Sequence, residues 1–368
     1  MRSFIIFIIC LLSCIMVMSQ KPAGRGIEVI AYYTGNNTMI DSFPVEKLTH
    51  IIYSFAHLSG DSISLRNNKD TITLQHLVAL KERNPQLKIM ISLGGWGGCA
   101  TCSDIFADRK QRKIFAKTVK EMFAYFNIDG IDLDWEYPAV EGYPGHKFAP
   151  EDKENFTELI KQLRHTLGKT AEISFASGGM EYQIDSSFEW KKIMPLVNRV
   201  NLMSYDLVSG YASTSGHHTA LYSSPQQVAS ADNGVMNLER LGVPANKIVI
   251  GAAFYARVFS NNIHANNGLY QPTKFAYGVS YKNFDTTFTK EKGYQYYWDS
   301  VAHAPYMYNE TDRSFASFDD TTSIRLKTKY SIDKKLNGIM FWELRDDSYT
   351  HSLLDAIDDE KRILLEKK

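Results

Sequence analysis

Eight short apolar runs, each followed by a turn and mostly by an amphipathic stretch, constrain the fold of this 368-residue chain. Nearly continuous apolar runs are typical of strands that are buried on both faces, as in parallel sheets. Alternating strands and helices predict right-handed crossovers, and eight such units predict a closed (β/α)8 barrel of the α/β class, the TIM barrel. The runs are Ile27–Tyr33, His50–Leu58, Leu87–Gly95, Ile128–Tyr137, Glu172–Gly178, Arg199–Leu207, Lys247–Tyr255 and Gly338–Leu344.

Helical periodicity is clearest over Asp104–Phe126, and similar patterns cover Glu151–Leu167 and Gln226–Leu241. Apolar residues that recur three and four positions apart form one face of a helix. In the first stretch that face comprises Phe106, Ile114, Phe115, Thr118, Val119, Met122 and Phe123. These stretches are predicted to cover the outside of the barrel.

The alternation is interrupted once, between Tyr255 and about Ser317, where Asn, Tyr, Phe and Gly are frequent. We expect a small α+β insertion here, residues 259–317, between the seventh and eighth barrel strands. The barrel itself would then comprise residues 20–258 and 318–368. Short antiparallel strands are predicted at Val279–Phe284, Tyr294–Trp298, Tyr306–Tyr308 and Ser314–Phe318.

The first 19 residues have the pattern of a secretory signal peptide. Arg2 precedes an apolar run that ends at Met18, which is shorter than a typical membrane span of roughly 20 residues. We expect cleavage after Ser19, no membrane span, and a secreted, extracellular or periplasmic monomer. An alternative is a lipid-anchored surface protein, because Leu11-Leu12-Ser13-Cys14 resembles a lipobox; apolar residues, however, continue beyond Cys14.

Charge and cysteine content exclude several classes of protein. Lys plus Arg and Asp plus Glu both number 41, so the basic surplus of a nucleic-acid-binding protein is absent. After removal of the leader, Cys99 and Cys102 would remain and are predicted to form a short disulfide. His217 and His218 have no third ligand nearby and are expected to be loop or sugar contacts, and the cysteines have no partner pair at zinc spacing. We therefore expect neither a metal nor a cofactor.

Three carboxylates alternate along the run Ile128–Tyr137. Asp132, Asp134 and Glu136 would share one strand face, which points into the barrel. Buried acids without a function are costly, and neighbouring acids share protons and shift their pKa. Such an arrangement can keep Glu136 protonated near neutral pH, as a general acid requires. The sequence thus predicts an active site here.

The segment Asp129-x-x-Asp132-x-Asp134-x-Glu136 closely resembles the signature of glycoside hydrolase family 18, the chitinase family. Ser92-Leu93-Gly94-Gly95-Trp96 and Met203-Ser204-Tyr205-Asp206 resemble its third-strand and sixth-strand motifs, and Trp342 matches the tryptophan beneath the scissile sugar. The resemblance implies a retaining chitinase that acts on chitin or chito-oligosaccharides, β-1,4-linked polymers and oligomers of N-acetylglucosamine. In this family the acetamido group of the substrate replaces an enzyme nucleophile.

The resemblance also implies a role for each site residue. Glu136 would protonate the leaving oxygen and then activate water, Asp134 would accept the acetamido N–H, and Tyr205 would donate to the acetyl oxygen. Asp132 would modulate Asp134, with Tyr32 and Ser92 supporting it. The other residues expected to bind substrate are Phe55, Trp96, Tyr137, Met203, Asp206, Tyr211, Arg257 and Trp342.

Two other functions fit the same fold. An endo-β-N-acetylglucosaminidase acting on glycoprotein glycans would share the acids, but the insertion and Trp342 argue against it. A non-catalytic chitin-binding lectin would typically lack the acid, whereas Glu136 is present here. The chain also departs from the family pattern: Tyr211 stands where many members have Trp, and Ala253 and Ala256 stand where Pro and Gly are usual.

Overall fold

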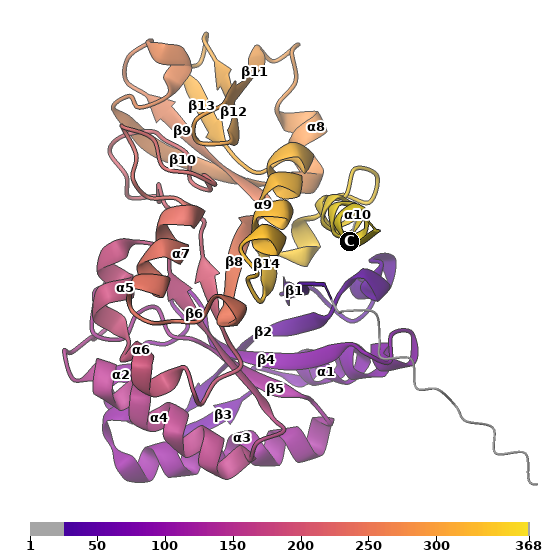
Figure 1. Ribbon diagram of the computed structural model, residues 1–368, viewed down its shortest axis with the longest axis vertical. Helices are drawn as coiled ribbons and strands as arrows, with labels where there is room; N and C mark the ends of the chain where they lie inside the picture. Colours follow the sequence, from indigo (N-terminus) through magenta and orange to yellow (C-terminus); the bar gives the residue numbers. More distant parts are fainter. Residues whose placement is uncertain (1–25, 367–368) are drawn as a thin grey trace, which may run out of the picture.

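Two β-sheets organise residues 26–366, the part of the chain that the computed structural model describes (Figure 1). Eight parallel strands follow one another in the order β1, β14, β8, β7, β6, β5, β4 and β2, and pairing of β1 with β2 closes the barrel. The strands are β1 (Glu28–Tyr33), β2 (His50–Ser59), β4 (Lys88–Gly94), β5 (Gly130–Asp134), β6 (Glu172–Gly178), β7 (Arg199–Met203), β8 (Ile248–Ala253) and β14 (Gly338–Trp342). The predicted (β/α)8 barrel is confirmed.

Helices cover the outside of the barrel (Figure 1). They are α1 (Asn68–Ala79), α2 (Cys102–Ala107), α3 (Arg109–Phe126), α4 (Asp152–Leu167), α5 (Glu181–Ser187), α6 (Trp190–Ile193), α7 (Ala231–Arg240), α9 (Thr321–Asp333) and α10 (Leu353–Glu366). None of the helices within residues 26–366 is long and apolar enough to span a membrane. The predicted signal peptide, residues 1–19, and Cys14 lie outside the described residues.

Two predicted helices differ from the observed ones because capping residues override apolar periodicity. Asp108 breaks the stretch Asp104–Phe126 into α2 and α3, since its carboxylate accepts the N–H groups of Lys110 and Gln111 at 2.6 and 3.0 Å. The helix predicted from Gln226 begins only at Ala231, after Ser230 caps it through the N–H of Asn233.

Alternation along the strands separates two cores. Outward-facing residues such as Ile131, Leu133 and Trp135 pack against the helices in the main core. Inward-facing residues such as Met90 and Met340 fill the barrel interior. The described interior is therefore packed with side chains, and in this fold the ligand sites lie at the carboxyl ends of the strands.

A charged network closes the amino-terminal end of the barrel. His50 contacts Glu172 at 3.0 Å, and Arg199 also pairs with Glu172. Despite burial, the hydrogen bond from His50 and the charge of Arg199 lower the pKa of Glu172 to about 2. These groups lie at the end of the barrel that in this fold serves stability rather than catalysis.

The second sheet is antiparallel, in the order β10, β9, β13, β12 and β11. Its strands are β9 (Tyr255–Asn261), β10 (Thr273–Ser280), β11 (Tyr294–Asp299), β12 (Ala304–Asn309) and β13 (Ser314–Ser317). A single residue, Phe254, separates β8 from β9, and β9 was not predicted as a strand of this sheet. The strand predicted at Val279–Phe284 is wrong beyond Ser280, because the chain turns through a 3-10 helix, Tyr281–Asn283, into α8 (Phe284–Thr287).

The insertion is tied to the loop that follows β7. His217 Nε2 lies 3.0 Å from Asp299 Oδ2, and the N–H groups of Leu221 and Tyr222 donate to Ala302 at 3.1 Å. At the base of the insertion Lys327 and Asp319, both completely buried, form an ion pair of 2.6 Å. The second sheet is thus fixed above the carboxyl ends of the barrel strands (Figure 1).

Candidate active site

β5 places Asp132 and Asp134 on the inward face of the barrel, and Glu136 follows two residues after the strand ends. Their neighbours come from the strands on either side. Asp132 is in register with Ser92 of β4 and Ser174 of β6. The three predicted acids therefore meet at the carboxyl end of the barrel, where active sites of this fold lie.

Asp132 is completely buried and accepts four hydrogen bonds. Oδ2 accepts from the hydroxyls of Tyr32 at 3.0 Å and Ser92 at 2.8 Å. Oδ1 accepts from Ser174 at 2.6 Å and from the amide of Asn201 at 3.1 Å. Burial raises the pKa of Asp132, and the three hydroxyl donors reduce this rise. Tyr32 and Ser92 were predicted here, whereas Ser174 and Asn201 were not.

Asp134 is buried, but its Oδ1 has no hydrogen-bond partner among the described residues. Burial, followed by the charges of Glu136 and Asp132, raises its pKa well above the ordinary value. Gly94 (φ 113°) lies so close that a Cβ there would be 2.2 Å from the carbonyl oxygen of Asp134. A buried carboxyl oxygen without a hydrogen-bond partner can accept a hydrogen bond from a ligand.

Glu136 is half-buried and forms a hydrogen bond with Tyr137. Burial, together with the negative charge of Asp206, raises the pKa of Glu136 to about 7. A carboxylic acid with this pKa holds its proton at slightly acidic to neutral pH and can then act as a general acid.

Tyr205 is almost fully buried, and its hydroxyl lies 3.8 Å from the sulfur of Met340. Burial, and then the charges of Asp134 and Glu136, raise its pKa well above the ordinary value. The hydroxyl therefore keeps its proton and is a hydrogen-bond donor next to the acids. Met203, also predicted, packs in the same interior cluster.

Asp206 is the charged centre of the neighbouring loop and has a left-handed backbone, φ 56°. Arg257 donates to both of its oxygens, and the hydroxyl of Tyr255 donates to Oδ1 at 2.6 Å. Nδ1 of His218 lies 3.4 Å from Oδ1 of Asp206. Although burial opposes the charge, hydrogen bonds from His218 and Arg257 hold the pKa of Asp206 well below its usual range.

Two groups of aromatic rings lie at the carboxyl end of the barrel strands. Trp342 stacks on Phe55 with centroids 5.5 Å apart and lies 5.9 Å from Tyr32. Trp96 follows β4, Tyr211 lies in the loop after β7, and the centroids of the two rings are 6.5 Å apart. Both groups had been predicted as substrate contacts from the resemblance.

Four residues of the site escaped the sequence prediction: Tyr143, Ser174, Asn201 and Tyr255. Alternation along the strands could have indicated two of them. Ser174 lies two residues after Glu172, and Asn201 two before Met203, on faces that point inward. Tyr143, in a loop, and Tyr255, the first residue of β9, approach the acids only in the fold.

The loop after β4 is closed by a disulfide between Cys99 and Cys102. His217 and His218 contact Asp299 and Asp206, so both are committed to protein contacts. Within residues 26–366 no group of three His, Cys, Asp or Glu side chains is arranged to hold a metal ion.

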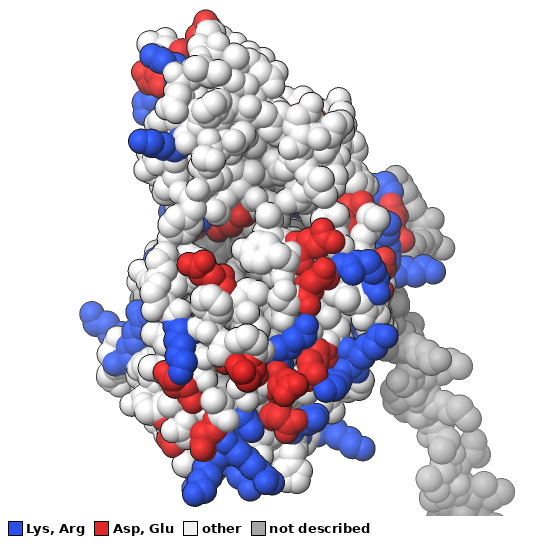
Figure 2. Space-filling model, turned by 90° about the vertical axis from the view of Figure 1, so that its left-hand side faces the viewer, with Lys and Arg blue, Asp and Glu red and all other residues white. Residues whose placement is uncertain are grey.

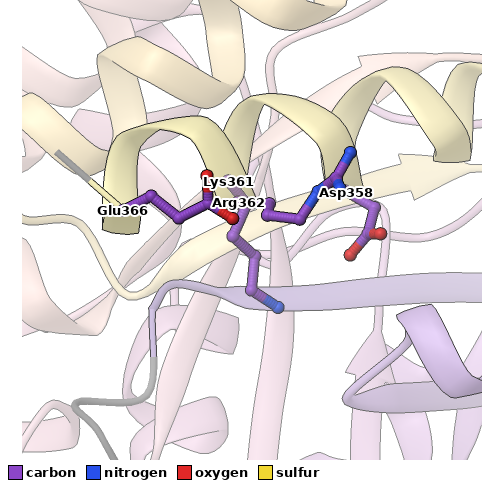
Figure 3. Close-up of a pocket in the computed structure, with 4 residues that line it drawn as sticks. All are labelled: Asp358, Lys361, Arg362 and Glu366. Atoms are coloured by element: carbon purple, nitrogen blue, oxygen red, sulfur yellow. The ribbon is translucent and has the colours of Figure 1, made fainter.

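The space-filling view in Figure 2 shows a hollow between the barrel and the insertion, with acidic side chains beside it and a nearly uncharged surface above. Figure 3 shows a different hollow, of about 350 Å³. It is lined by Asp358, Lys361, Arg362 and Glu366, which all belong to α10. None of the predicted site residues is part of it.

Comparisons with known proteins agree on one family. Residues 28–347 match the model described as glycosyl hydrolases family 18. The chain is 34% identical to "Chitinase A1" of Niallia circulans over 74% of its own length but spans only 42% of that enzyme. It is 30% identical to mouse "Chitotriosidase-1", covering 92% of this chain and 77% of the relative. A solved family 18 N-acetylglucosaminidase from Paenibacillus barengoltzii is 34% identical, with a TM-score of 0.83 and coverage of 91% and 99%.

Proposed function

Because this chain belongs to glycosyl hydrolases family 18, we propose that it is a chitinase that hydrolyses β-1,4 links between N-acetylglucosamine units with retention at the anomeric carbon. The chain spans less than half of the Niallia enzyme, so the proposal concerns the activity of this barrel alone.

The single observation that carries the proposal is the unpartnered Oδ1 of Asp134 beside the hydroxyl of Tyr205. An acetamido group has one N–H donor and one carbonyl acceptor. Asp134 offers the matching acceptor, and Tyr205 offers the matching donor. This pair suits a 2-acetamido sugar and holds its carbonyl oxygen near the anomeric carbon, so no separate nucleophile is required.

The proposed reaction has two steps. In the first, Glu136 gives its proton to the glycosidic oxygen while the acetamido oxygen attacks the anomeric carbon, so the glycosidic bond breaks and an oxazolinium ion forms. The negative charge of Asp134 stabilises this cation. In the second step, Glu136, now a carboxylate, removes a proton from water, and the water oxygen attacks the same carbon. Ring opening restores the acetamide, and the product has the β configuration.

The remaining predicted residues are proposed to bind the sugar chain. Trp342, with Phe55 and Tyr32 beside it, would lie beneath the scissile sugar, because aromatic rings stack on the apolar faces of pyranoses. Asp206 and Arg257 would offer polar contacts above it. The other proposed contacts are Ser92, Trp96, Tyr137, Met203 and Tyr211.

We further propose that the protein acts as a secreted monomer. The disulfide between Cys99 and Cys102 supports export, since such bonds persist in oxidising compartments. The leader predicted at residues 1–19 supports the same conclusion.

A time course with chito-oligomers, with the two anomers resolved, tests the proposal. Fresh products should be β-anomers, and a fully deacetylated polymer should resist cleavage. Initial α-anomers would refute the mechanism. The same experiment decides a second candidate, removal of single N-acetylglucosamine units, which the similarity to the Paenibacillus barengoltzii enzyme supports. That activity would release the monosaccharide together with the oligomer one unit shorter at each step, whereas a chitinase that splits internal links releases the dimer and other fragments from the start.

A further inference from the structure

Tyr143, in the loop between β5 and α4, begins a tight turn. The N–H of His146 donates to the carbonyl oxygen of Tyr143 at 3.0 Å, and Gly145 has φ 85°. Pro144 and Gly145 at the two central positions are typical of a type II turn. The turn brings the His146 ring to 4.8 Å from the Tyr143 ring. The Tyr143 side chain is thus supported although 39% of it is exposed.

Two glycines allow this loop to lie directly on the active site. A Cβ at Gly142 would come within 2.0 Å of the carbonyl oxygen of Glu136. A Cβ at Gly97, where φ is 82°, would be 3.1 Å from the Tyr143 ring. Tyr143 therefore lies next to the backbone of the proposed acid and packs on the loop after β4.

The ring of Tyr143 meets Trp96 edge-on, with centroids 5.6 Å apart and planes 66° apart. Trp96 in turn lies 6.5 Å from Tyr211. The exposed fractions of Trp96 and Tyr211 are 48% and 71%. Three exposed rings from three different loops thus form one aromatic row at the barrel mouth, although exposed aromatics ordinarily bury their apolar faces.

The strand order of the closed sheet places this aromatic row relative to Trp342 and Glu136. β14 and β5 are four strands apart in a circuit of eight, so their ends lie on opposite sides of the mouth. Trp342 ends β14, and Glu136 and Tyr143 follow β5. A sugar chain whose scissile unit rests on Trp342 passes Glu136 and then leaves the mouth over the loop that carries Tyr143.

From this placement we propose that Tyr143 determines substrate length: its ring binds a β-1,4-linked 2-acetamido sugar on the leaving-group side, beyond the unit that meets Trp96. The inference rests on the proposed function. A hexamer reaches this ring in a productive complex, whereas a trimer that fills the sites on the Trp342 side does not.

Substitution of Tyr143 by Ala and by Phe tests the proposal through the ratio of kcat/KM for the hexamer to kcat/KM for the trimer of N-acetylglucosamine. In Tyr143→Ala the ratio falls about 3- to 10-fold, mainly through a higher KM for the hexamer, since a lost aromatic contact changes affinity by this factor. Tyr143→Phe keeps the ratio, because the phenyl ring retains the stacking face. Tyr125→Ala, which removes a 71% exposed ring on α3, is the matched control and keeps both values.

Three outcomes are distinguishable. An unchanged ratio in Tyr143→Ala overturns the inference, and so does an equal loss on both substrates, which indicates a structural role. Failure of the parent enzyme to cleave any acetylated oligomer overturns the proposed function instead.

If Tyr143→Ala unfolds, a binding experiment replaces the kinetic one. The hexamer is titrated calorimetrically into Glu136→Gln alone and into Glu136→Gln combined with either Tyr143→Phe or Tyr143→Leu. Weaker binding with Leu but not with Phe supports the inference, and equal binding overturns it.

Discussion

Asp132 accepts four hydrogen bonds, whereas Asp134, two residues further along the same face of β5, has an oxygen with no hydrogen-bond partner among the described residues. Both carboxyls are buried, and burial raises the pKa of both. The hydroxyl donors around Asp132 offset part of the effect of burial on its pKa, whereas the charges of Glu136 and Asp132 add to the effect of burial on the pKa of Asp134. The two carboxyls therefore differ in how strongly their surroundings stabilise the charged form, and this difference allows them to have different roles.

The first prediction concerns Ser174, which donates to Asp132 at 2.6 Å. Ser174→Ala should raise the pKa of Asp132, because it removes a donor to the charged form. The acidic limb of the kcat/KM pH profile should then move to higher pH, with a loss of about 1–3 kcal/mol in the free energy of unfolding. Ser177→Ala is the matched control. Ser177 is equally buried in β6 but donates to the carbonyl of Gly178, so its loss should leave the limb in place.

The second prediction concerns the proton donor. Glu136→Gln should lower kcat by about 10²–10⁴-fold or more, because the amide cannot donate a proton to the leaving oxygen. Sugar binding and the folded structure should persist, since only one oxygen is exchanged for an NH2 group. Steady-state kinetics and calorimetric titration with a hexamer measure both effects. Turnover near that of the parent would show that another group is the acid.

The third prediction follows from the raised pKa of Glu136. As a general acid it must be protonated, so kcat/KM should fall as the pH rises through about 7. Between pH 4.5, the ordinary pKa of a glutamate, and about pH 7, the folded state keeps the proton of Glu136, whereas the unfolded chain releases it. This stabilising contribution is complete below the ordinary pKa and is lost as the pH rises through the folded one.

Glu136→Gln isolates that contribution, because glutamine does not titrate. The free energy of unfolding of the variant relative to the parent should therefore increase by about 1–2 kcal/mol from pH 4.5 to pH 8, a value reduced for solvent access and coupling to Asp134. Chemical denaturation at several pH values measures the difference. A constant difference across this range would contradict the raised pKa.

Local periodicity accounts for how much of the fold could be predicted. Strands buried on both faces are recognisable from their own residues, and Asp132, Asp134 and Glu136 differ from that apolar background. Periodicity did not give the strand ends: β5 stops at Asp134, although the run continues to Tyr137. Aromatic residues at Tyr281 and Phe284 likewise have high strand propensity, yet Tyr281 begins a 3-10 helix and Phe284 begins α8, and both pack in the core of the insertion.

The remaining site residues depend on contacts between distant segments. Asn201 reaches Asp132 across 69 residues of chain, and His217 reaches Asp299 across 82. A polar residue within an apolar run gives no sign of its partner, because register between strands is set by the whole barrel. The resemblance supplied Tyr32 and Ser92 as supports of Asp132, but it supplied neither Ser174 nor Asn201.

The fourth prediction concerns the disulfide that closes the loop carrying Trp96. Replacement of Cys99 and Cys102 by serine should lower the free energy of unfolding by about 2 kcal/mol, the entropic value for so short a loop. Hexamer binding should weaken as well, because Trp96 lies in the loop between β4 and the disulfide. Denaturation with and without reductant provides the check: reductant should bring the parent to the variant's stability and leave the variant unchanged. A reduced parent that keeps its full stability would be inconsistent with this prediction.

The last prediction separates the two members of the Asp206–Arg257 pair. The negative charge of Asp206 raises the pKa of Glu136. Asp206→Asn removes that charge and should move the basic limb of the kcat/KM profile to lower pH. Arg257→Gln leaves the carboxyl in place, and Asp206 then loses two hydrogen bonds that hold its pKa low. Asp206 should still ionise near neutral pH, because the hydroxyl of Tyr255 and the ring of His218 remain beside it. The basic limb should therefore not move to lower pH in Arg257→Gln, even where overall activity falls.

Arg257→Lys, which keeps the charge without the paired donors, should recover part of that activity. The kcat/KM pH profiles of the three variants, measured on one oligomer, test this prediction. The basic limb in Arg257→Gln could shift to lower pH as far as it does in Asp206→Asn. That result would mean that the pair acts on Glu136 through position rather than through the charge of Asp206.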